Sequence, residues 1–354
     1  MIDLARQREA SAVASSFAQP RTLISVAAII FDWVLLVAAV LIAVVASALL
    51  VKLAAAIVAG TAISMLFILG HDAAHRSLVA NRTLNEILGR VLFLPCLHNY
   101  TLWVVQHNRL HHQSANVKGL NSFSPLSPEE YSNATAGRRL IERIYRSPVG
   151  FGLYYLIERW WRDKFFPRPG TRSWRRYQAW ADLAVLCIWM GLLTWGLIEV
   201  GLRTEGASPI TALFWGFVLP FLVWNQLMGM TAFLQHTHPN VAWFRARGEE
   251  YGMYSPAEHT VLVNFPAWYD VLSHNIMQHQ AHHINARIPW FRLKVAQRRL
   301  SELTGPDVTV ARMSVKYLLY LTRNCQLYDY ESGVWLRFSG RPSSARVAHA
   351  SASI

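Results

Sequence analysis

The chain has 354 residues, of which 53% are hydrophobic and only 16% are charged, and its mean hydropathy is +0.20. Soluble domains carry roughly 25% charged residues, so this composition indicates a membrane protein. The net charge of +13 does not require a nucleic-acid partner, and we expect none, because Lys and Arg also gather on the cytoplasmic side of membrane spans.

Four apolar segments are long enough to cross a membrane, since a helix rises about 1.5 Å per residue and the hydrocarbon core is about 30 Å thick. From Trp33 to Gly70 the only charge is Lys52, which predicts spans at about 30–51 and 53–70 joined by a turn near Lys52. Two further spans are predicted at 177–199 and 209–235, the last kinked by Pro220. We therefore predict an all-α integral membrane protein whose four transmembrane helices form two hairpins.

Four spans place both termini and the long middle loop on one side of the membrane. Of the 34 Lys and Arg residues, 32 lie in those parts of the chain, so that side is predicted to be cytoplasmic. Within the middle loop, residues 86–105 and 141–166 have the mixed composition of helices that lie in the membrane interface. We expect a membrane domain over 1–300, a cytoplasmic C-terminal extension over 301–340 and a disordered tail over 341–354.

The fourteen histidines are mostly grouped at the ends of apolar segments. On an α-helix, residues three or four positions apart lie on one face, so each group can direct two or three imidazoles toward one place on the predicted cytoplasmic side. The groups are H-D-A-A-H (His71 and His75), H-N-R-L-H-H (His107, His111 and His112), Q-H-T-H-P (His236 and His238) and H-Q-A-H-H (His279, His282 and His283).

These imidazoles indicate a metal site. Imidazole binds zinc, copper, iron and nickel, and a zinc site typically needs three or four ligands. Eight or nine histidines exceed the needs of one ion but suit two ions with positions left open for oxygen. Carboxylates are scarce nearby, Asp72 and Asp270 being the main ones, and the three cysteines are too far apart for a thiolate site. The residues therefore predict an all-nitrogen dinuclear site rather than the carboxylate site of soluble di-iron bundles.

The order H-x3-H, H-x3-H-H and H-x2-H-H between two pairs of apolar segments resembles the three histidine boxes of the membrane-bound fatty acid desaturase superfamily, over roughly residues 30–300. F-L-Q-H-T-H-P and H-N-I before the last box are similar to the acyl-lipid Δ12/ω3 branch. The resemblance implies a cytoplasmic helical cap with a non-haem di-iron centre, O2 as co-substrate and electrons from ferredoxin or a cytochrome b5-type protein. The donor is expected to be a separate protein, because the chain has no H-P-G-G motif and no cysteine cluster.

Carried over position by position, the resemblance implies that two iron ions are bound by the box histidines and by one histidine on the last span. These are His71, His75, His107, His111, His112, His279, His282 and His283, with His236 as the additional ligand.

Four other residues are possible supports of this site. His238 lies two positions beyond His236 and is either a further ligand or an orienting residue, and His274 is left open between ligand support and ordinary packing. Asp72 and Asn275 can orient imidazoles by hydrogen bonds, as metal-bound histidines usually require. We do not expect the remaining histidines to be ligands; these are His98, His259 and His349.

The resemblance implies O2-dependent desaturation of a fatty acyl chain in contact with membrane lipids. The acyl group can be linked to lipid, coenzyme A or a carrier protein, or be a free acid, and the spans are expected to form an apolar tunnel that ends below the histidines. Two alternatives on the same scaffold stay open, decarboxylation of a fatty acid to a terminal alkene and hydroxylation of an alkyl or carotenoid substrate. A metal transporter or sensor is less favoured, because transporters carry polar binding sites near the middle of the membrane.

Overall fold

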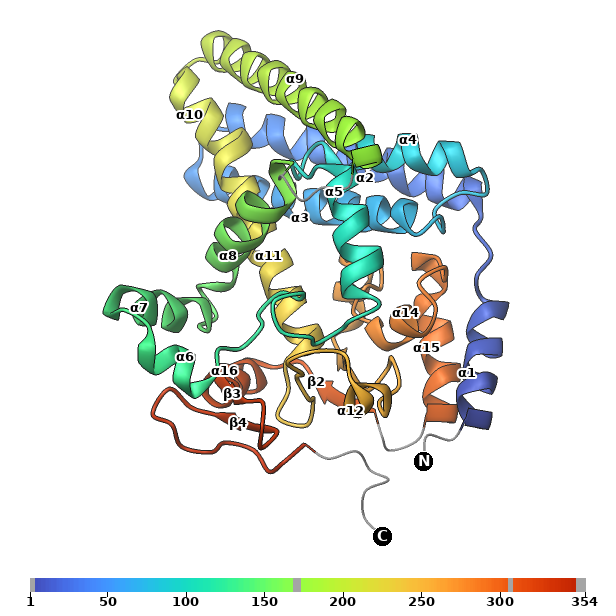
Figure 1. The fold of residues 1–354 in the computed structure, drawn as a ribbon. Helices are drawn as coiled ribbons and strands as arrows, with labels where there is room; N and C mark the ends of the chain where they lie inside the picture. The colour runs from blue at the N-terminus through green and yellow to red at the C-terminus, as the bar shows by residue number, and fades with distance from the viewer. Residues whose placement is uncertain (1–3, 168–172, 305–307, 348–354) are drawn as a thin grey trace.

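The structure is a computed structural model, which describes residues 4–167, 173–304 and 308–347. It is mostly helical (Figure 1), and four helices of the described chain are long and apolar enough to cross a membrane. They are α2 (Thr22–Val45), α3 (Leu49–Ala74), α9 (Ser173–Arg203) and a unit that runs from Pro209 to His236. The prediction of a mostly helical protein with four membrane-length helices is confirmed at this level.

The connection between the first two long helices lies earlier in the chain than the sequence predicts. α2 begins at Thr22, and α2 and α3 pack along each other, joined by residues 46–48. Lys52 is therefore inside the first turn of α3, where its ammonium donates a hydrogen bond to the carbonyl oxygen of Val44 at 3.0 Å. A charge inside the helix is tolerated because it satisfies a carbonyl left open at the C-terminus of α2.

The outer faces of the long helices are apolar. Ile30, Phe31 and Val34 on α2 and Ile188 and Trp195 on α9 are exposed, as lipid-facing side chains would be. In contrast, 67% of the apolar stretch of α3 is buried, against 17% for α9. α3 is thus the central helix, and its C-terminal end is surrounded by the rest of the chain.

The fourth long helix changes its winding before Pro220. It consists of α10 (Pro209–Leu213), the π-helical turn η3 (Phe214–Val218) and α11 (Leu219–His236). Pro220 has no N–H to continue an α-helical ladder, and a π turn is one way to accommodate that loss. Beside it α3 and α11 come close: a Cβ on Gly60 would lie 2.7 Å from the carbonyl oxygen of Pro220. Small residues permit such contacts between membrane helices.

The middle loop folds into short helices. Both of its predicted interfacial helices are interrupted, one at residues 94–99 and one at 146–150, and each interruption contains a proline, Pro95 or Pro148, that cannot donate to a helical ladder. The elements are α4 (Arg82–Phe93), α5 (Tyr100–Val104), η1 (Val105–His111), α6 (Pro128–Asn133), α7 (Ala136–Tyr145), α8 (Phe151–Tyr154) and η2 (Tyr155–Phe165).

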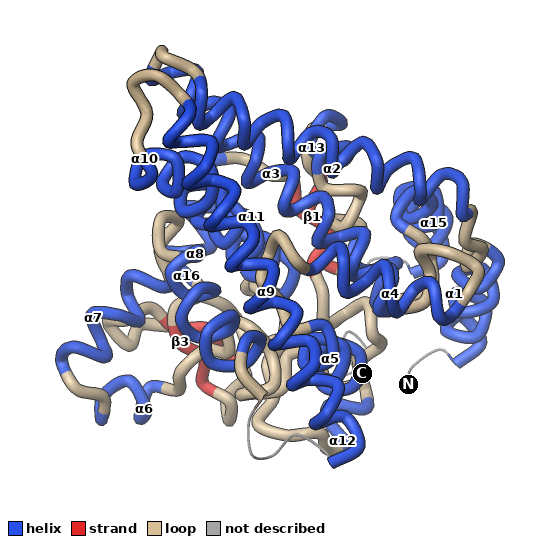
Figure 2. The backbone as a smooth tube through the Cα atoms, turned by 90° about the horizontal axis from the view of Figure 1, so that it is seen from above, coloured by secondary structure: helices blue, strands red, loops and turns tan. Residues whose placement is uncertain are grey.

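In Figure 1 the chain after α11 lies below the long helices, and Figure 2, seen from above, shows its helix α15 (Trp290–Thr304) beside the N-terminal helix. The helix α1 (Leu4–Ser16) contacts α15. The helices here are α12 (Glu249–Gly252), α13 (Ala267–Leu272), α14 (His279–Ile284), α15 (Trp290–Thr304) and α16 (Val315–Asn324).

Two small sheets depart from the predicted all-α fold. β1 (Val261–Asn264) pairs in parallel with β2 (Thr309–Arg312), and β3 (Leu327–Asp329) pairs antiparallel with β4 (Val334–Leu336). Of the predicted disordered tail, residues 348–354 lie outside the described residues. Residues 341–347 instead hydrogen-bond beside β4, where the backbone N–H of Ser343 donates to the carbonyl oxygen of Trp335.

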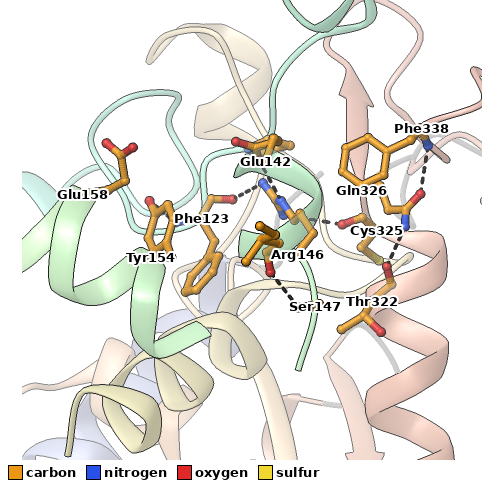
Figure 3. Close-up of polar contacts among 12 residues, drawn as sticks. Phe123, Glu142, Arg146, Ser147, Tyr154, Glu158, Thr322, Cys325, Gln326 and Phe338 are labelled. Carbon is orange, nitrogen blue, oxygen red and sulfur yellow. Dashed lines mark hydrogen bonds and ion pairs between the residues drawn. The ribbon is translucent and has the colours of Figure 1, made fainter. Parts of the chain in front are cut away.

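A buried arginine joins the middle loop to the C-terminal part (Figure 3). The guanidinium of Arg146 donates to the carbonyl oxygen of Phe123 at 2.8 Å and to that of Cys325 at 3.4 Å, and it lies beside the carboxylate of Glu142. Charge-assisted bonds of this kind are stronger than neutral ones. Arg146 thereby fixes the loop that follows η1, and that loop supports one of the histidines described below.

Candidate metal centre

Nine histidines gather in two clusters at the ends of α3 and α11. Within each cluster, the candidate ligand nitrogens all lie within 4.8 Å of one another, and no described Cys, Asp or Glu belongs to either cluster. The first cluster contains His71, His75, His107, His112 and His282. The second cluster contains His111, His236, His279 and His283. The structure thus brings together all nine histidines that the sequence indicated as ligands.

The spacing of the boxes predicts that all histidines of one box point to the same place, but the structure differs. Two of the three boxes are divided between the clusters. His107 and His112 enter the first cluster and His111 the second, because η1 is π-helical and the backbone N–H of His112 bonds to the carbonyl oxygen of His107, five residues back. In α14, His279 and His283 share a face in the second cluster, while His282 points to the first. π turns are frequent at functional sites.

Helix ends position the remaining ligands. His71 lies in the last turn of α3 and His75 is its C-terminal cap, after which Arg76 adopts a left-handed conformation with φ 60°. His236 is the last residue of α11. The N-terminal turn of α14 is held by Gln297 of α15, whose Oε1 accepts from the backbone N–H of Ala281 at 2.9 Å. The ends of these helices thus present the imidazoles at fixed positions.

The spacing of the nitrogens fits bound metal ions. In the first cluster the Nε2 atoms of His71 and His107, of His107 and His112, and of His112 and His282 lie 3.1, 3.1 and 3.0 Å apart. In the second, the Nε2–Nε2 separations are 3.0, 3.1 and 3.2 Å, for His236–His279, His279–His283 and His283–His111. Two imidazoles at right angles on one ion, each about 2.1 Å from it, place their nitrogens about 3.0 Å apart.

A hydrogen-bond network explains this arrangement less well. A neutral imidazole has one donor and one acceptor nitrogen, whereas here four or five ring nitrogens converge on one point. His75 Nε2 is also buried without a hydrogen-bond partner among the described residues. An ion at each point of convergence would accept all of these lone pairs together, so the residues fit two metal ions.

The imidazoles are held in the neutral form that binds metals. Burial lowers the pKa of His111 to about 4. Burial also lowers the pKa well below 6.5 for five other cluster members outside the long helices, with neighbouring imidazoles adding to the shift: His107, His112, His279, His282 and His283. Metal ligands must be unprotonated, and the site meets this condition at neutral pH.

Two amides orient the second cluster, and neither was identified from the sequence. Asn121 Oδ1 lies 2.5 Å from His111 Nδ1, and Asn116 Oδ1 lies 3.1 Å from His236 Nδ1, which also faces the carbonyl oxygen of His259 at 3.0 Å. Hydrogen bonds to the second ring nitrogen fix the tautomer and orientation of a ligand. The available signal was the presence of asparagines directly after the second box.

Asp72 supports the first cluster weakly. Its Oδ1 lies 3.4 Å from His71 Nδ1, and its Oδ2 accepts a hydrogen bond from the backbone N–H of Trp290 at 2.7 Å. The carboxylate thus links the ligand helix α3 to the start of α15.

Three other candidates lie away from the clusters. His238 Nδ1 accepts from the backbone N–H of Asn240, and His274 Nε2 lies 2.7 Å from the buried carboxylate of Asp32 on α2. Asn275 donates to the carbonyl oxygen of Trp290 rather than to an imidazole. His98 bonds to the hydroxyl of Tyr155, and His349 lies outside the described residues.

An apolar cavity of about 350 Å³ borders both clusters. Histidines of both clusters line it, as do Phe67, Trp103 and Met228. The α3 residues on its wall recur every three or four positions and so lie on one helix face. They are Ile57, Thr61, Ser64, Ile68 and His71, and Phe67 lies beside them on the same helix.

A second cavity, of about 740 Å³, borders the clusters and is polar. His75, His112 and His283 line it, together with Arg76 and Arg287. The site is thus bordered by one apolar and one polar cavity.

The chain is similar in sequence to known proteins. A sequence profile of the family described as fatty acid desaturase matches residues 47–314. The sn-1 oleoyl-lipid 12-desaturase of Synechocystis sp. is 27% identical over 280 residues, which cover 77% of this chain and 75% of that protein. The corresponding enzyme of Anabaena variabilis is 25% identical over 288 residues, covering 77% of this chain and 76% of that protein.

Plant relatives are longer. The chloroplastic omega-6 fatty acid desaturase of Arabidopsis thaliana is 27% identical over 277 residues, covering 77% of this chain but only 58% of the plant protein. The family profile spans α3, α11 and all three boxes, so the match includes every member of the two clusters.

Proposed function

We propose that this chain, which belongs to the fatty acid desaturase family, is an oxidoreductase and is similar to acyl-lipid 12-desaturases, introduces a carbon–carbon double bond into a fatty acyl chain with O2 and electrons from a separate protein. The acyl chain loses two hydrogens with their two electrons. The donor supplies two more electrons, and with two further protons one O2 becomes two waters. The observation that carries the proposal is the pair of all-histidine clusters on the wall of an apolar cavity.

The nine histidines would hold two iron ions, five ligands at one and four at the other. Iron would supply the oxidising chemistry that no side-chain acid or base can apply to an unactivated C–H bond. The chain itself contributes neutral, oriented imidazoles and an apolar cavity that excludes water. Two of these histidines have an amide oxygen beside the second ring nitrogen, which fixes their orientation. Asn121 lies beside His111, and Asn116 lies beside His236.

The acyl chain would lie in the apolar cavity along α3. From Ile57 to His71, a rise of 1.5 Å per residue gives about 21 Å of helix face for methylene groups to contact. Holding the chain there presents chosen methylenes to the clusters, and such positioning is a major contribution to catalysis. Where the head of the acyl chain is anchored would then decide which bond is oxidised.

The long helices would cross the membrane as two hairpins, with the termini, the shorter helices as a cap and both clusters on the cytoplasmic side. The support is the position of 32 of the 34 Lys and Arg residues in the parts of the chain that four spans place together. In this arrangement residues 1–300 form the membrane domain and residues 301–340 a cytoplasmic extension.

The electron donor would be a ferredoxin or a cytochrome b5-type protein. The polar cavity supports this choice, since it borders His75, His112 and His283 and carries Arg76, Arg90 and Arg287 on its wall. Basic residues attract acidic partners and speed their association.

Mass spectrometry of cells that express the wild type or His283→Ala tests the proposal. New unsaturated acyl chains that depend on His283 are expected in the lipids. A volatile alkene one carbon shorter, or a hydroxylated product, would replace desaturation by decarboxylation or hydroxylation. Iron in the purified protein should approach about two ions per chain, and one zinc without iron would reject the dinuclear site.

A further inference from the structure

The apolar cavity has a polar corner that the proposed function does not use. Lys164 of η2 lines the cavity, and its side chain is only 5% exposed. Among the described residues its ammonium has no hydrogen bond or ion pair within contact distance, and the nearest influence of opposite charge on it is that of the neighbouring carboxylate of Asp163. A buried cation without a partner is costly, and native proteins rarely keep one.

Two neighbours on the cavity wall also have unused hydrogen-bonding groups. Arg159 pairs through Nη1 with the carboxylate of Asp163 at 2.9 Å, but its Nε is buried without a partner. Gln106 donates to the carbonyl oxygen of Asp163, and its Oε1 is buried without a partner. Buried polar groups left unpaired in this way call for a bound molecule or water.

The charges of this corner favour an anion. Arg159 brings one positive charge, Lys164 brings a second when its amine is protonated, and Asp163 brings one negative charge. Burial, and then the nearby guanidinium of Arg159, lower the pKa of Lys164 well below its usual value. The ammonium therefore lacks solvation, and an anionic oxygen could replace it. A neutral ester carbonyl would not neutralise the positive charge of the ammonium.

We propose that Lys164 and Arg159 bind the anionic head, a carboxylate or a phosphate, of a single-chain acyl substrate whose methylenes lie along α3. The inference rests on the proposed function, because it assigns the head-group end of the same cavity. The cavity volume of about 350 Å³ suits one acyl chain with a small head group and is too small to enclose a whole two-chain lipid. The anchor would fix the position of the new double bond relative to the head.

Equilibrium binding to the purified full-length protein in detergent, without electron donor, is the test. The probes are radiolabelled oleate, oleyl phosphate and methyl oleate, which share a chain and differ in the head. Lys164→Met should weaken the binding of the anionic probe by about 10-fold or more, as expected for a lost charge-assisted bond, and change methyl oleate binding by less than about 2-fold. Lys164→Arg should retain the affinity for the anion.

Arg162→Gln is the matched control, since Arg162 lies on the same helix but is 57% exposed and pairs with Glu158. It should leave all three affinities unchanged. Lys164-dependent binding of oleate identifies a free carboxylate as the head, and Lys164-dependent binding of oleyl phosphate identifies a phosphate. Equal affinity for the acid and the ester in the wild type, or an equal loss for both in Lys164→Met, would overturn the proposal.

Product analysis separates failure of this inference from failure of the proposed function. If the wild type makes double bonds but Lys164→Met makes the same isomer with unchanged KM, the anchor is wrong and the desaturase stands. If the wild type makes no double bond yet binds the anion through Lys164, the anchor stands and the reaction is different. With both correct, Lys164→Met should raise KM and spread the double bond over several positions.

Discussion

The two histidine clusters differ in the hydrogen bonds to the ring nitrogens that face away from the cluster. In the four-histidine cluster, an amide oxygen lies 2.5 Å from His111 and another lies 3.1 Å from His236. In the five-histidine cluster, the described residues offer only the carboxylate of Asp72, 3.4 Å from His71. The cluster with fewer histidines therefore has the closer outer hydrogen bonds, while the other has more candidate ligands.

The two clusters can therefore be perturbed separately, even though two of the boxes contribute histidines to both of them. Each additional ligand reduces the dependence on any single orientation, whereas a four-ligand site depends more on each ring being fixed. Replacing histidines tests whether the clusters are two separate sites. Replacing the residues that hydrogen-bond to them tests whether these bonds contribute differently to metal binding in the two clusters.

Adjacent ligands give the largest expected effect. His282 belongs to the first cluster and His283 to the second. His282→Ala and His283→Ala should each abolish product formation and lower the iron content from about two ions per chain to about one. The remaining ion should differ between the two variants, and Mössbauer spectra of purified, iron-57-loaded protein measure this. Loss of both ions in both variants would mean that the clusters form one cooperative site.

The separation of His282 from His283 also shows what the sequence could predict. Local spacing at the ends of apolar segments predicted that the eight box histidines converge, the resemblance added His236, and the structure gathers all nine. Their division between clusters could not be predicted, because the spacing in V-Q-H-N-R-L-H-H is equally compatible with an α-helix. The π-helical bond between His112 and His107 depends on packing that no local pattern encodes.

The supports were harder to predict than the ligands. Asn121 reaches His111 through a loop that Arg146 holds by the carbonyl oxygen of Phe123, and Arg146 itself contacts Cys325, far along the chain. The small sheet of β1 and β2 likewise pairs Val261 with Thr309. Such long-range contacts leave no periodic signal, unlike the four membrane-length helices, whose composition is enough.

Removing an orienting amide should have the second-largest effect. Asn121→Ala should weaken metal binding in the four-histidine cluster by about 10- to 100-fold, the usual cost of losing an outer hydrogen bond. Asp72→Asn should have a smaller effect on the five-histidine cluster, because its contact is longer. Metal titration of chelator-treated protein with Co2+ and absorption spectroscopy compare the two. An equal loss in both variants would remove the distinction between the clusters.

A buried pair outside both clusters should affect the fold more than the metals. His274→Ala leaves the carboxylate of Asp32 buried without its partner at 2.7 Å, and should lower the free energy of unfolding by about 3 kcal/mol. Both ions should be retained below the unfolding temperature. Thermal unfolding followed by circular dichroism, with iron analysis of the folded protein, measures this. Adding Asp32→Asn should recover part of the loss, and selective loss of one ion would instead make His274 part of that site.

The smallest effect is expected at His238, two residues from His236. α11 ends at His236, Thr237 is extended, and His238 is turned to the backbone N–H of Asn240 at 3.0 Å, outside the second cluster. His238→Ala should therefore cost about 1 kcal/mol for the lost hydrogen bond, with full iron content and product yield within about two-fold of the wild type. Iron analysis and product yield, with His236→Ala as the positive control, decide between the two histidines. Loss of iron from the four-histidine cluster in His238→Ala would mean that the extended segment swings toward the metal when it binds, and that the firmer cluster is not already formed in the metal-free chain.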